Sequence, residues 1–309
     1  MMKSVNFVVL GEQSIADEFG KSGTKTDIAM YDRKESDIIR TWVVPNGFPD
    51  KIQPLFQAIS LGEYVIFYVG SLDKFIGEQI IALDLLKKRE GVLSHTYEVD
   101  ENRLNSMING TVLERYKLVN SSDLKQVINK LEPLSKEGKT KIVIDHCFDV
   151  KGVGTVVLGK VAQGRIKQYD TLKLLPAGID IVIKSIQMHD DPATEAVSPA
   201  RVGLSLKGAK PDEINRGDIL CEDPTLYKIK SEIELDFKKN PFYKGEISEN
   251  QMCLVSIDMQ IKAAKFVSVN PVKLRLEKPA VFDNDTCVIL KPDSENIRIL
   301  GSGMIINHQ

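Results

Sequence analysis

The pattern of apolar residues changes near residue 136, and this change constrains the fold more than any other feature of the chain. Before it, short apolar runs such as Tyr64–Val69 alternate with amphipathic segments such as Gly77–Lys88. After it, short apolar runs follow one another at glycine turns with almost no helical spacing. Alternating strands and helices predict a mostly parallel sheet with helical crossovers, whereas closely spaced strands with glycine turns predict β-barrels. We therefore expect one α/β domain followed by two antiparallel β-barrels.

The expected domains are residues 1–136, 137–225 and 226–309, with a polar, glycine-ended linker at the first boundary. In the α/β domain we expect strands at Val5–Leu10, Ile39–Val44, Tyr64–Val69 and Gly91–Thr96, and helices at Asp50–Ser60, Gly77–Lys88, Asp100–Asn109 and Ser122–Lys136. In the first barrel we expect strands at Lys141–Phe148, Gly154–Val161, Thr171–Leu175, Ile181–Met188, Val202–Leu206 and Asp218–Cys221. In the second barrel we expect strands at Lys228–Asp236, Gln251–Met259, Ile261–Val269, Pro271–Pro279, Asp285–Leu290 and Ile297–Ile306.

Composition argues against several classes of protein. The 309 residues carry a net charge of −2, so any RNA contact has to come from a local basic patch. The four cysteines lie far apart without a C-x-x-C pair, which favours buried, reduced thiols over zinc. No apolar run approaches the ~20 residues of a membrane span, and the N-terminus leads into a strand rather than a signal peptide. We expect a cytoplasmic protein with no metal site and no membrane or DNA partner.

A phosphate-binding loop has lost its chemistry at the end of the first strand. A strand–loop–helix NTPase would carry G-x-x-x-x-G-K-[ST] here, with backbone N–H groups and a lysine around the phosphates. Gly11 keeps the first glycine, but Ala16, Asp17 and Glu18 occupy the positions of the second glycine, the lysine and the magnesium-binding hydroxyl. Two carboxylates there would repel a triphosphate. The nearby Gly20-Lys21-Ser22 is either a surface turn, which we favour, or a rearranged phosphate site.

A glycine-centred hairpin, Gly152–Val156, lies within the apolar stretch Ile142–Gly164. Together with Ile183–His189, Arg201–Ala209 and Asp212–Leu220, this stretch resembles domain 2 of elongation factor Tu and its relatives.

Further stretches extend the resemblance over nearly the whole chain. Phe19–Thr24 with Thr26–Tyr31, and Gly77–Leu86, are similar to the archaeal SelB-like elongation factor of the EF-Pyl type. Phe242–Gly245 and Ile257–Lys265 are similar to the SelB branch. The resemblance implies a Rossmann-like P-loop domain, similar to a G-domain, followed by two antiparallel β-barrels in the elongation factor Tu architecture.

A GTPase of this family also needs a D-x-P-G segment, a histidine that orients the attacking water, and an N-K-x-D element that selects guanine. Pro45 and Gly47 match the first, but a valine replaces the aspartate and Phe48 stands nearest to the histidine position. Of the residues at the position of the N-K-x-D element, only Asp100 could still accept hydrogen bonds from a guanine base. Because each lost transition-state contact costs ~3–4 kcal/mol, we expect no useful turnover, no catalytic residue, and neither GTP nor Mg²⁺ as a working cofactor.

Four residues are candidates for RNA contact. By resemblance, Arg216 matches a family arginine near the tRNA acceptor end, and His189 lies at the edge of the family's amino-acid pocket. Lys262 and Lys265 belong to a locally basic stretch beside aromatic residues, which is compatible with RNA binding. Each also has a structural interpretation, as a solvated turn arginine, a histidine that caps the barrel, or solvated lysines. His146 follows the alternation of the apolar residues before it, so we expect a core histidine.

Three functions remain open on these patterns. The first is an elongation-factor-like protein that binds tRNA or the ribosome through its barrels without hydrolysing GTP. The second is an active, divergent GTPase that delivers a special aminoacyl-tRNA, such as a selenocysteinyl or pyrrolysyl species. The third is a protein-interaction scaffold without an RNA role. We favour the first, because the loop has lost its cation while the barrel motifs are intact.

Overall fold

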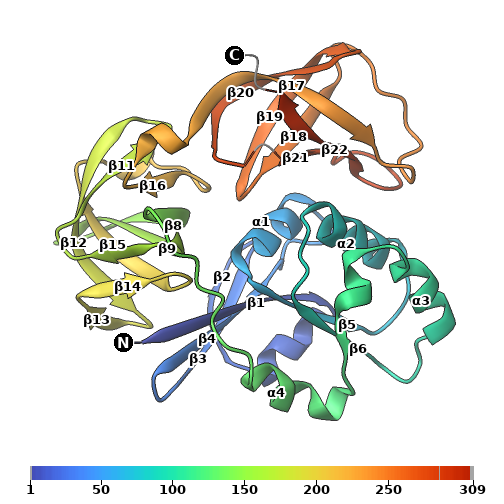
Figure 1. Cartoon of the computed structure of the whole chain (residues 1–309), viewed down its shortest axis with the longest axis horizontal. Helices are drawn as coiled ribbons and strands as arrows, with labels where there is room; N and C mark the ends of the chain where they lie inside the picture. The colour runs from blue at the N-terminus through green and yellow to red at the C-terminus, as the bar shows by residue number, and fades with distance from the viewer. Residues whose placement is uncertain (1, 285, 307–309) are drawn as a thin grey trace.

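The computed structural model describes residues 2–284 and 286–306 and contains one mixed sheet with helices and two β-barrels (Figure 1). The N-terminal sheet has the strand order β2-β3-β4-β1-β5-β6-β7, and β1 is parallel to both of its neighbours. Its strands are β1 (Lys3–Gly11), β2 (Lys21–Lys25), β3 (Ala29–Glu35), β4 (Ile38–Val44), β5 (Tyr64–Val69), β6 (Gly91–His95) and β7 (Lys117–Leu118). The helices are α1 (Gln53–Leu61), α2 (Lys74–Leu85), α3 (Glu101–Ile108) and α4 (Ser121–Asn129), with 3-10 helices η1 (Gln13–Glu18) and η2 (Val112–Arg115).

The central strand β1 is buried on both faces because it is a continuous apolar run. Val8 and Leu10 belong to a core shared with α1, α2 and α3, whereas Phe7 and Val9 belong to a core shared with η1 and α4. Phe7 stacks on Trp42 of β4, with 5.7 Å between ring centroids. The predicted α/β domain is therefore confirmed, and the structure places helices on both faces of its sheet.

The chain directly after β1 departs from the expected pattern. A short 3-10 helix, η1, leads into an antiparallel hairpin of β2 and β3 that the sequence did not predict. The segment Gly20-Lys21-Ser22, expected as a surface turn, instead enters strand β2 at Lys21. We missed this hairpin because β2 consists of polar residues and glycine and so lacks apolar alternation.

All four helices differ from their expected limits, and for two of them the local reason is clear. α2 begins earlier, at Lys74, because the Asp73 carboxylate caps it by accepting two backbone N–H groups. α4 ends at Asn129, well before the expected end. Pro133 lies just beyond, where neither it nor the residue before it favours helical continuation.

The first barrel has the strand order β11-β16-β8-β9-β15-β12-β13, and an additional β11–β12 pairing closes six of these strands into a ring. A register shift between Ile144 and His146 turns the histidine out of the barrel core and toward Thr26 of the α/β domain, so the expectation of a core histidine is wrong. The strands are β8 (Lys141–Val150), β9 (Gly154–Gln163), β10 (Arg165–Lys167), β11 (Thr171–Leu175), β12 (Ile179–Met188), β13 (Asp191–Ala193), β14 (Glu195–Val197), β15 (Arg201–Lys207) and β16 (Ile219–Cys221).

The second barrel is closed in the order β17-β20-β19-β18-β21-β22, and it packs on α1 and α2 of the α/β domain (Figure 1). The expected strand Asp285–Leu290 begins at Thr286, and Asp285 lies outside the described residues. The strands are β17 (Lys228–Lys239), β18 (Met252–Ile257), β19 (Gln260–Val269), β20 (Val272–Phe282), β21 (Thr286–Leu290) and β22 (Ile299–Ile306), and the 3-10 helices are η3 (Pro211–Glu213) and η4 (Pro224–Leu226).

The two predicted barrels are confirmed, whereas the boundaries at residues 136 and 225 stay predictions. All four cysteines are free thiols, and Cys221, Cys253 and Cys287 are buried. In the described part of the chain, every helix is too short or too polar to cross a membrane.

Candidate functional site

The residues predicted to form a nucleotide site lie along one edge of the α/β sheet. Strands β1, β4, β5 and β6 are parallel, so their carboxyl ends meet at the same edge. Gly11 ends β1, Pro45, Gly47 and Phe48 follow β4, and Asp100 follows β6. This is the edge at which open α/β sheets bind ligands.

Two backbone N–H groups at this edge are already bonded within the protein. The Gly11 N–H donates to the side-chain oxygen of Gln79 on α2 at 2.7 Å, and the Glu12 N–H donates to the Tyr68 carbonyl at 2.7 Å. Gly11 has φ +78°, and a Cβ at this position would lie 2.0 Å from the Tyr68 oxygen. Only glycine fits there. The close approach of β1 to β5 therefore accounts for Gly11 without any phosphate.

The three altered loop positions fall in η1 and have different environments. Ala16 is fully buried in the core that also holds Phe19 and Trp42, whereas Asp17 and Glu18 are exposed. η1 has only six residues and replaces the long helix whose N-terminus attracts phosphate in working loops. A magnesium–triphosphate complex does not fit this set of residues, which offers two carboxylates, no lysine and no free N–H at Gly11.

Phe48, nearest to the position of the family's catalytic histidine, points into the interface between the α/β domain and the second barrel. Its side chain is 5% exposed and packs edge-on against Phe75, with 5.9 Å between ring centroids. The guanidinium of Arg298, which precedes β22 in the second barrel, lies 5.4 Å from the centre of the same ring. The Gly47 N–H donates to the Asp27 carbonyl at 2.8 Å. Phe48 therefore joins the α/β domain to the second barrel and has no polar atom that could orient a water.

Asp100 has a structural role that needs no nucleotide. Its carboxylate accepts a hydrogen bond from the Arg103 N–H at 3.1 Å and so caps α3. The side chain is exposed, and the neighbouring Tyr97 is 94% exposed. The role of Asp100 as a remnant of a guanine reader stays a prediction.

Arg216 and His189 lie in the contact between the first barrel and the α/β domain. Arg216 pairs with both carboxylate oxygens of Asp27, at 2.7 and 3.0 Å, and donates to two further oxygens. Burial would raise the pKa of Asp27, but the hydrogen bond and charge of Arg216 outweigh it and lower that pKa. His189 Nε2 lies 2.7 Å from an Asp32 oxygen on β3. Both candidates are thus engaged between domains, and their RNA role stays a prediction.

Lys262 and Lys265 share strand β19 but have different environments. Lys262 is 8% exposed, and burial lowers its pKa although the charge of Asp218 acts in the opposite direction. Asp218 is also buried, which raises its pKa, and one of its carboxylate oxygens has no hydrogen-bond partner among the described residues. Lys265 is exposed and lies opposite Arg275 of β20. Lys265 therefore presents its charge to solvent, whereas Lys262 does not.

Sequence reasoning missed the ion pairs that join the three domains. Arg298 pairs with Glu78 of α2 at 2.6 Å, and Lys160 of β9 pairs with Glu63 of the α/β domain at 2.7 Å. Their partners lie far apart along the chain, so no local spacing reveals them. The one available signal is a charged residue within an apolar element, because such a residue needs a buried partner.

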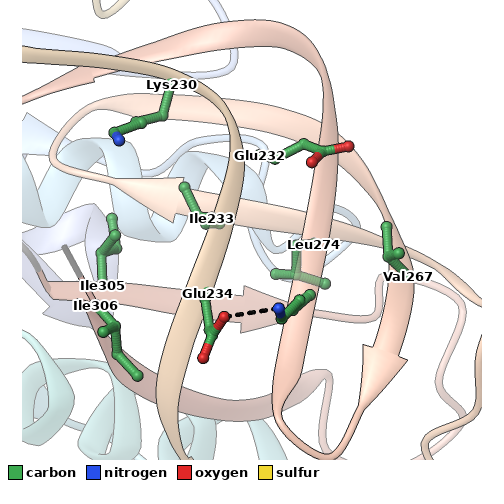
Figure 2. Close-up of a pocket in the computed structure, with 9 residues that line it drawn as sticks. Lys230, Glu232, Ile233, Glu234, Val267, Leu274, Ile305 and Ile306 are labelled. Atoms are coloured by element: carbon green, nitrogen blue, oxygen red, sulfur yellow. Dashed lines mark ion pairs between the residues drawn. The ribbon is translucent and has the colours of Figure 1, made fainter. Parts of the chain in front are cut away.

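A small cavity lies on the wall of the second barrel, between strands β17, β19, β20 and β22 (Figure 2). Lys273 and Glu234, which pair at 2.9 Å, line it together with Ile233 and Leu274. Its volume of about 190 Å³ is below the ~300–1,000 Å³ of most small-molecule sites. We assign it no ligand.

An α/β domain followed by two β-barrels, and joined to them by ion pairs, has the domain arrangement of the translation elongation factor class. The sequence model of elongation factor Tu domain 2 matches residues 154–221. The chain is 33% identical over 299 residues to an uncharacterized protein of Methanocaldococcus jannaschii, and the match covers 95% of this chain and 96% of that protein.

Similarity to two more distant proteins indicates the family within this class. The chain is 29% identical over 175 residues to the selenocysteine-specific elongation factor of Methanocaldococcus jannaschii, a match that covers 55% of this chain but only 36% of that factor. The crystal structure of translation elongation factor SelB from Methanococcus maripaludis with the GTP analogue GppNHp has the same fold, with a TM-score of 0.82 at 21% identity over 100% of this chain and 80% of that one. The chain belongs to the SelB/elongation factor Tu-like family of translation elongation factors.

Proposed function

We propose that this protein is a SelB-like translation factor that binds tRNA or the ribosome through its barrels and does not use GTP as a switch. The hydrogen bond from the Gly11 N–H to Gln79 carries the proposal, because it occupies the first donor of the ancestral phosphate loop. The short η1 and the exposed carboxylates of Asp17 and Glu18 support it. Without a γ-phosphate to order mobile segments, release from RNA could not be timed by hydrolysis.

A second candidate is a divergent GTPase that delivers a special aminoacyl-tRNA. The observation in its favour is the SelB structure with the same fold, which was solved with a GTP analogue. That function would require Gln79 to release the Gly11 N–H and η1 to rearrange around the phosphates.

Titration of the wild-type chain with GTP or GDP and Mg²⁺ in a calorimeter separates these candidates. We expect no binding at nucleotide concentrations up to about 1 mM. Any binding free energy would then be weaker than about −4 kcal/mol, the value for a dissociation constant of about 1 mM. We expect the same of the triple variant Ala16→Gly, Asp17→Lys and Glu18→Thr, which restores the letters of the motif. The reason is that those substitutions restore neither the helix after the loop nor the free N–H of Gly11.

Circular dichroism of the triple variant shows whether it remains folded after the loss of the buried Ala16 methyl group. Micromolar affinity in the wild type contradicts the proposal and favours an active GTPase. If only the folded triple variant binds with micromolar affinity, then nucleotide binding was lost through the substitutions at residues 16–18. The hydrogen bond between the Gly11 N–H and Gln79 would not be the cause.

Binding of total tRNA at low salt tests the other half of the proposal. We expect Lys265→Glu to weaken binding about three- to ten-fold and to reduce the slope of log K against log salt by about 1, because an exposed lysine at a phosphate releases a counterion. Filter binding over a range of salt concentrations measures both quantities.

The matched control is Lys117→Glu, an equal charge reversal on β7 at the far edge of the α/β sheet. Equal losses of tRNA affinity in the two variants would show that Lys265 contributes only through non-specific charge. Crosslinking of the protein in cells, followed by sequencing of bound RNA, identifies tRNA or ribosomal RNA as the partner. No RNA in either assay points instead to a protein-interaction scaffold.

A further inference from the structure

Four basic side chains of the first barrel lie at or next to its contact with the α/β domain, and together they make up its basic face: Arg216, Arg201, His146 and His189. Three of the four are linked. The Arg216 Nε–H donates to the Asp145 carbonyl at 3.1 Å, and the Asp145 carboxylate is shared by Arg201, at 3.0 Å, and by His146 Nδ1, at 2.6 Å. His146 Nε2 in turn lies 3.4 Å from the Thr26 hydroxyl of the α/β domain.

Two carboxylates from the hairpin of β2 and β3 occupy this basic face, where β3 lies beside the first barrel in Figure 1. Asp27, in the connection between the two strands, accepts hydrogen bonds from both Nη atoms of Arg216, at 2.7 and 3.0 Å. Asp32 on β3 lies 2.7 Å from His189 Nε2. A carboxylate and a phosphate present a similar pair of oxygens to an arginine fork. The hairpin therefore fills two positions that are chemically suited to the phosphates of an RNA backbone.

Water reaches the pair of Arg216 and Asp27, in contrast to the pair that joins the second barrel. The side chains of Arg216 and Asp27 are 24% and 38% exposed, against 8% and 1% for Arg298 and Glu78. Exposed ion pairs are screened and hold their partners weakly. The backbone carbonyl of Asp27 is bonded separately, by the Gly47 N–H at 2.8 Å. The Asp27 carboxylate can therefore leave Arg216 by rotation of one side chain while the hairpin stays in place.

We propose that Asp27 and Asp32 act as an intramolecular competitor, which covers the basic face of the first barrel until the phosphates of a bound RNA displace them. This inference rests on the proposed function, since it takes RNA as the ligand. The competitor lowers the affinity for every RNA by the same factor, because only the uncovered fraction of the protein offers Arg216 to a phosphate. Weakly held polyanions are thereby excluded, whereas an RNA that also contacts other parts of the barrels is retained.

Filter binding of total tRNA to the full-length chain and to its Asp27→Ala variant tests the proposal. We expect Asp27→Ala to bind about three- to ten-fold more tightly than the wild type, because Arg216 no longer has to be released from a carboxylate of its own chain. Asp32→Ala should give a smaller gain, because a histidine carries positive charge only when it is protonated. A purely structural contact between the hairpin and the barrel predicts no gain. The pair of Lys34 and Asp191, at 2.5 Å and of the opposite sense, fits either account.

The matched control is Asp50→Ala, which removes an exposed carboxylate from the same neighbourhood. Asp50 lies three residues after Gly47 and has no ion pair among the residues that the structure describes. It therefore measures the general effect of one negative charge near the barrel. In an Arg216→Ala background, Asp27→Ala should strengthen tRNA binding no more than Asp50→Ala does. Circular dichroism establishes that each variant is folded.

Phenylglyoxal, which modifies accessible arginines, reports on the cover without RNA. We expect Arg216 to react several times faster in Asp27→Ala than in the wild type, and added tRNA to protect it, as measured by mass spectrometry of the digested protein. Arg275, which is 67% exposed and lies in the second barrel, is the internal reference and should react at the same rate in both proteins.

Four results overturn the proposal. Two of them are a gain in Asp27→Ala no larger than that in Asp50→Ala, and a gain that persists without Arg216. If the wild type binds tRNA in those cases, the proposed function stands and only the competitor is lost. If neither the wild type nor any variant binds tRNA at low salt, the proposed function fails and the competitor fails with it. Equal affinity of Asp27→Ala for polyglutamate and for tRNA would indicate an acidic protein partner in place of RNA.

Discussion

The Arg298→Leu variant is expected to unfold with a free energy about 3–5 kcal/mol lower than that of the wild type. Arg298 donates to Glu78 at 2.6 Å, and Glu78 is 1% exposed, so the substitution leaves a buried carboxylate without its counter-charge. The same guanidinium donates to the Pro49 carbonyl at 2.6 Å and covers the Phe48 ring, and both contacts are lost with it. Urea unfolding followed by circular dichroism measures the loss.

Two further variants show whether the buried pair is the cause. Arg275→Leu removes a pair of the same chemistry, also 2.6 Å long, but Arg275 and Glu232 are 67% and 62% exposed, so it should cost less than ~1 kcal/mol. The double variant Glu78→Leu and Arg298→Leu should recover much of the loss, because no lone charge stays buried. If Arg298→Leu costs no more than Arg275→Leu, the Glu78 pair does not hold the second barrel on the α/β domain.

The elements that were predicted closely are those whose signals are local. β5 and β11 have the expected limits, Tyr64–Val69 and Thr171–Leu175, because each is an apolar run between turns. The barrels followed from the repetition of such runs with glycine between them. The hairpin of β2 and β3 escaped prediction because β2 has no apolar face. His146 was predicted on the wrong face of its strand, because the register shift between Ile144 and His146 does not show in the alternation of apolar and polar residues.

The candidate site was predictable as a list of residues but not as a set of contacts. Ala16, Asp17 and Glu18 depart from the expected motif, but nothing local indicated that Gln79 would bond the Gly11 N–H. The resemblance marked Arg216 as a tRNA contact, whereas the structure pairs it with Asp27, 189 residues earlier in the chain. Pairings between domains depend on tertiary packing, and a single sequence does not encode them as a spacing.

These contacts bear on how the protein works, because they fall in segments that a bound nucleotide would reorganise in a switching relative. Asp27, in the connection between β2 and β3, is fixed to the first barrel by Arg216. Phe48, after β4, is fixed to the second barrel by Arg298. Each of these two segments thus has its barrel partner within the chain, which supports the proposal that the protein does not use GTP as a switch.

Stability is expected to fall in acid because Asp145 becomes protonated. Burial alone would raise the pKa of Asp145, but Arg201 and His146 outweigh it and lower this pKa from 3.8 to about 2. The folded-state pKa is therefore depressed, so the stabilisation is complete above pH 3.8 and is lost as pH falls toward 2. At 1.36 kcal/mol per pKa unit, it amounts to about 2 kcal/mol. Urea unfolding of the wild type between pH 7 and about pH 2 measures this loss.

The Asp145→Asn variant identifies the group responsible. The amide keeps the shape of the carboxylate but not its charge, so the Arg201 guanidinium loses its ionic partner and His146 Nδ1, 2.6 Å from Asp145, loses a charged acceptor. We expect this variant to be about 2 kcal/mol less stable than the wild type at pH 7 and to converge with it near pH 2. Asp149→Asn, at an exposed position of the same strand, should leave the pH profile unchanged. Parallel profiles for wild type and Asp145→Asn would show that the acid sensitivity arises elsewhere, and that the contact between Asp145, His146 and Arg201 does not set it.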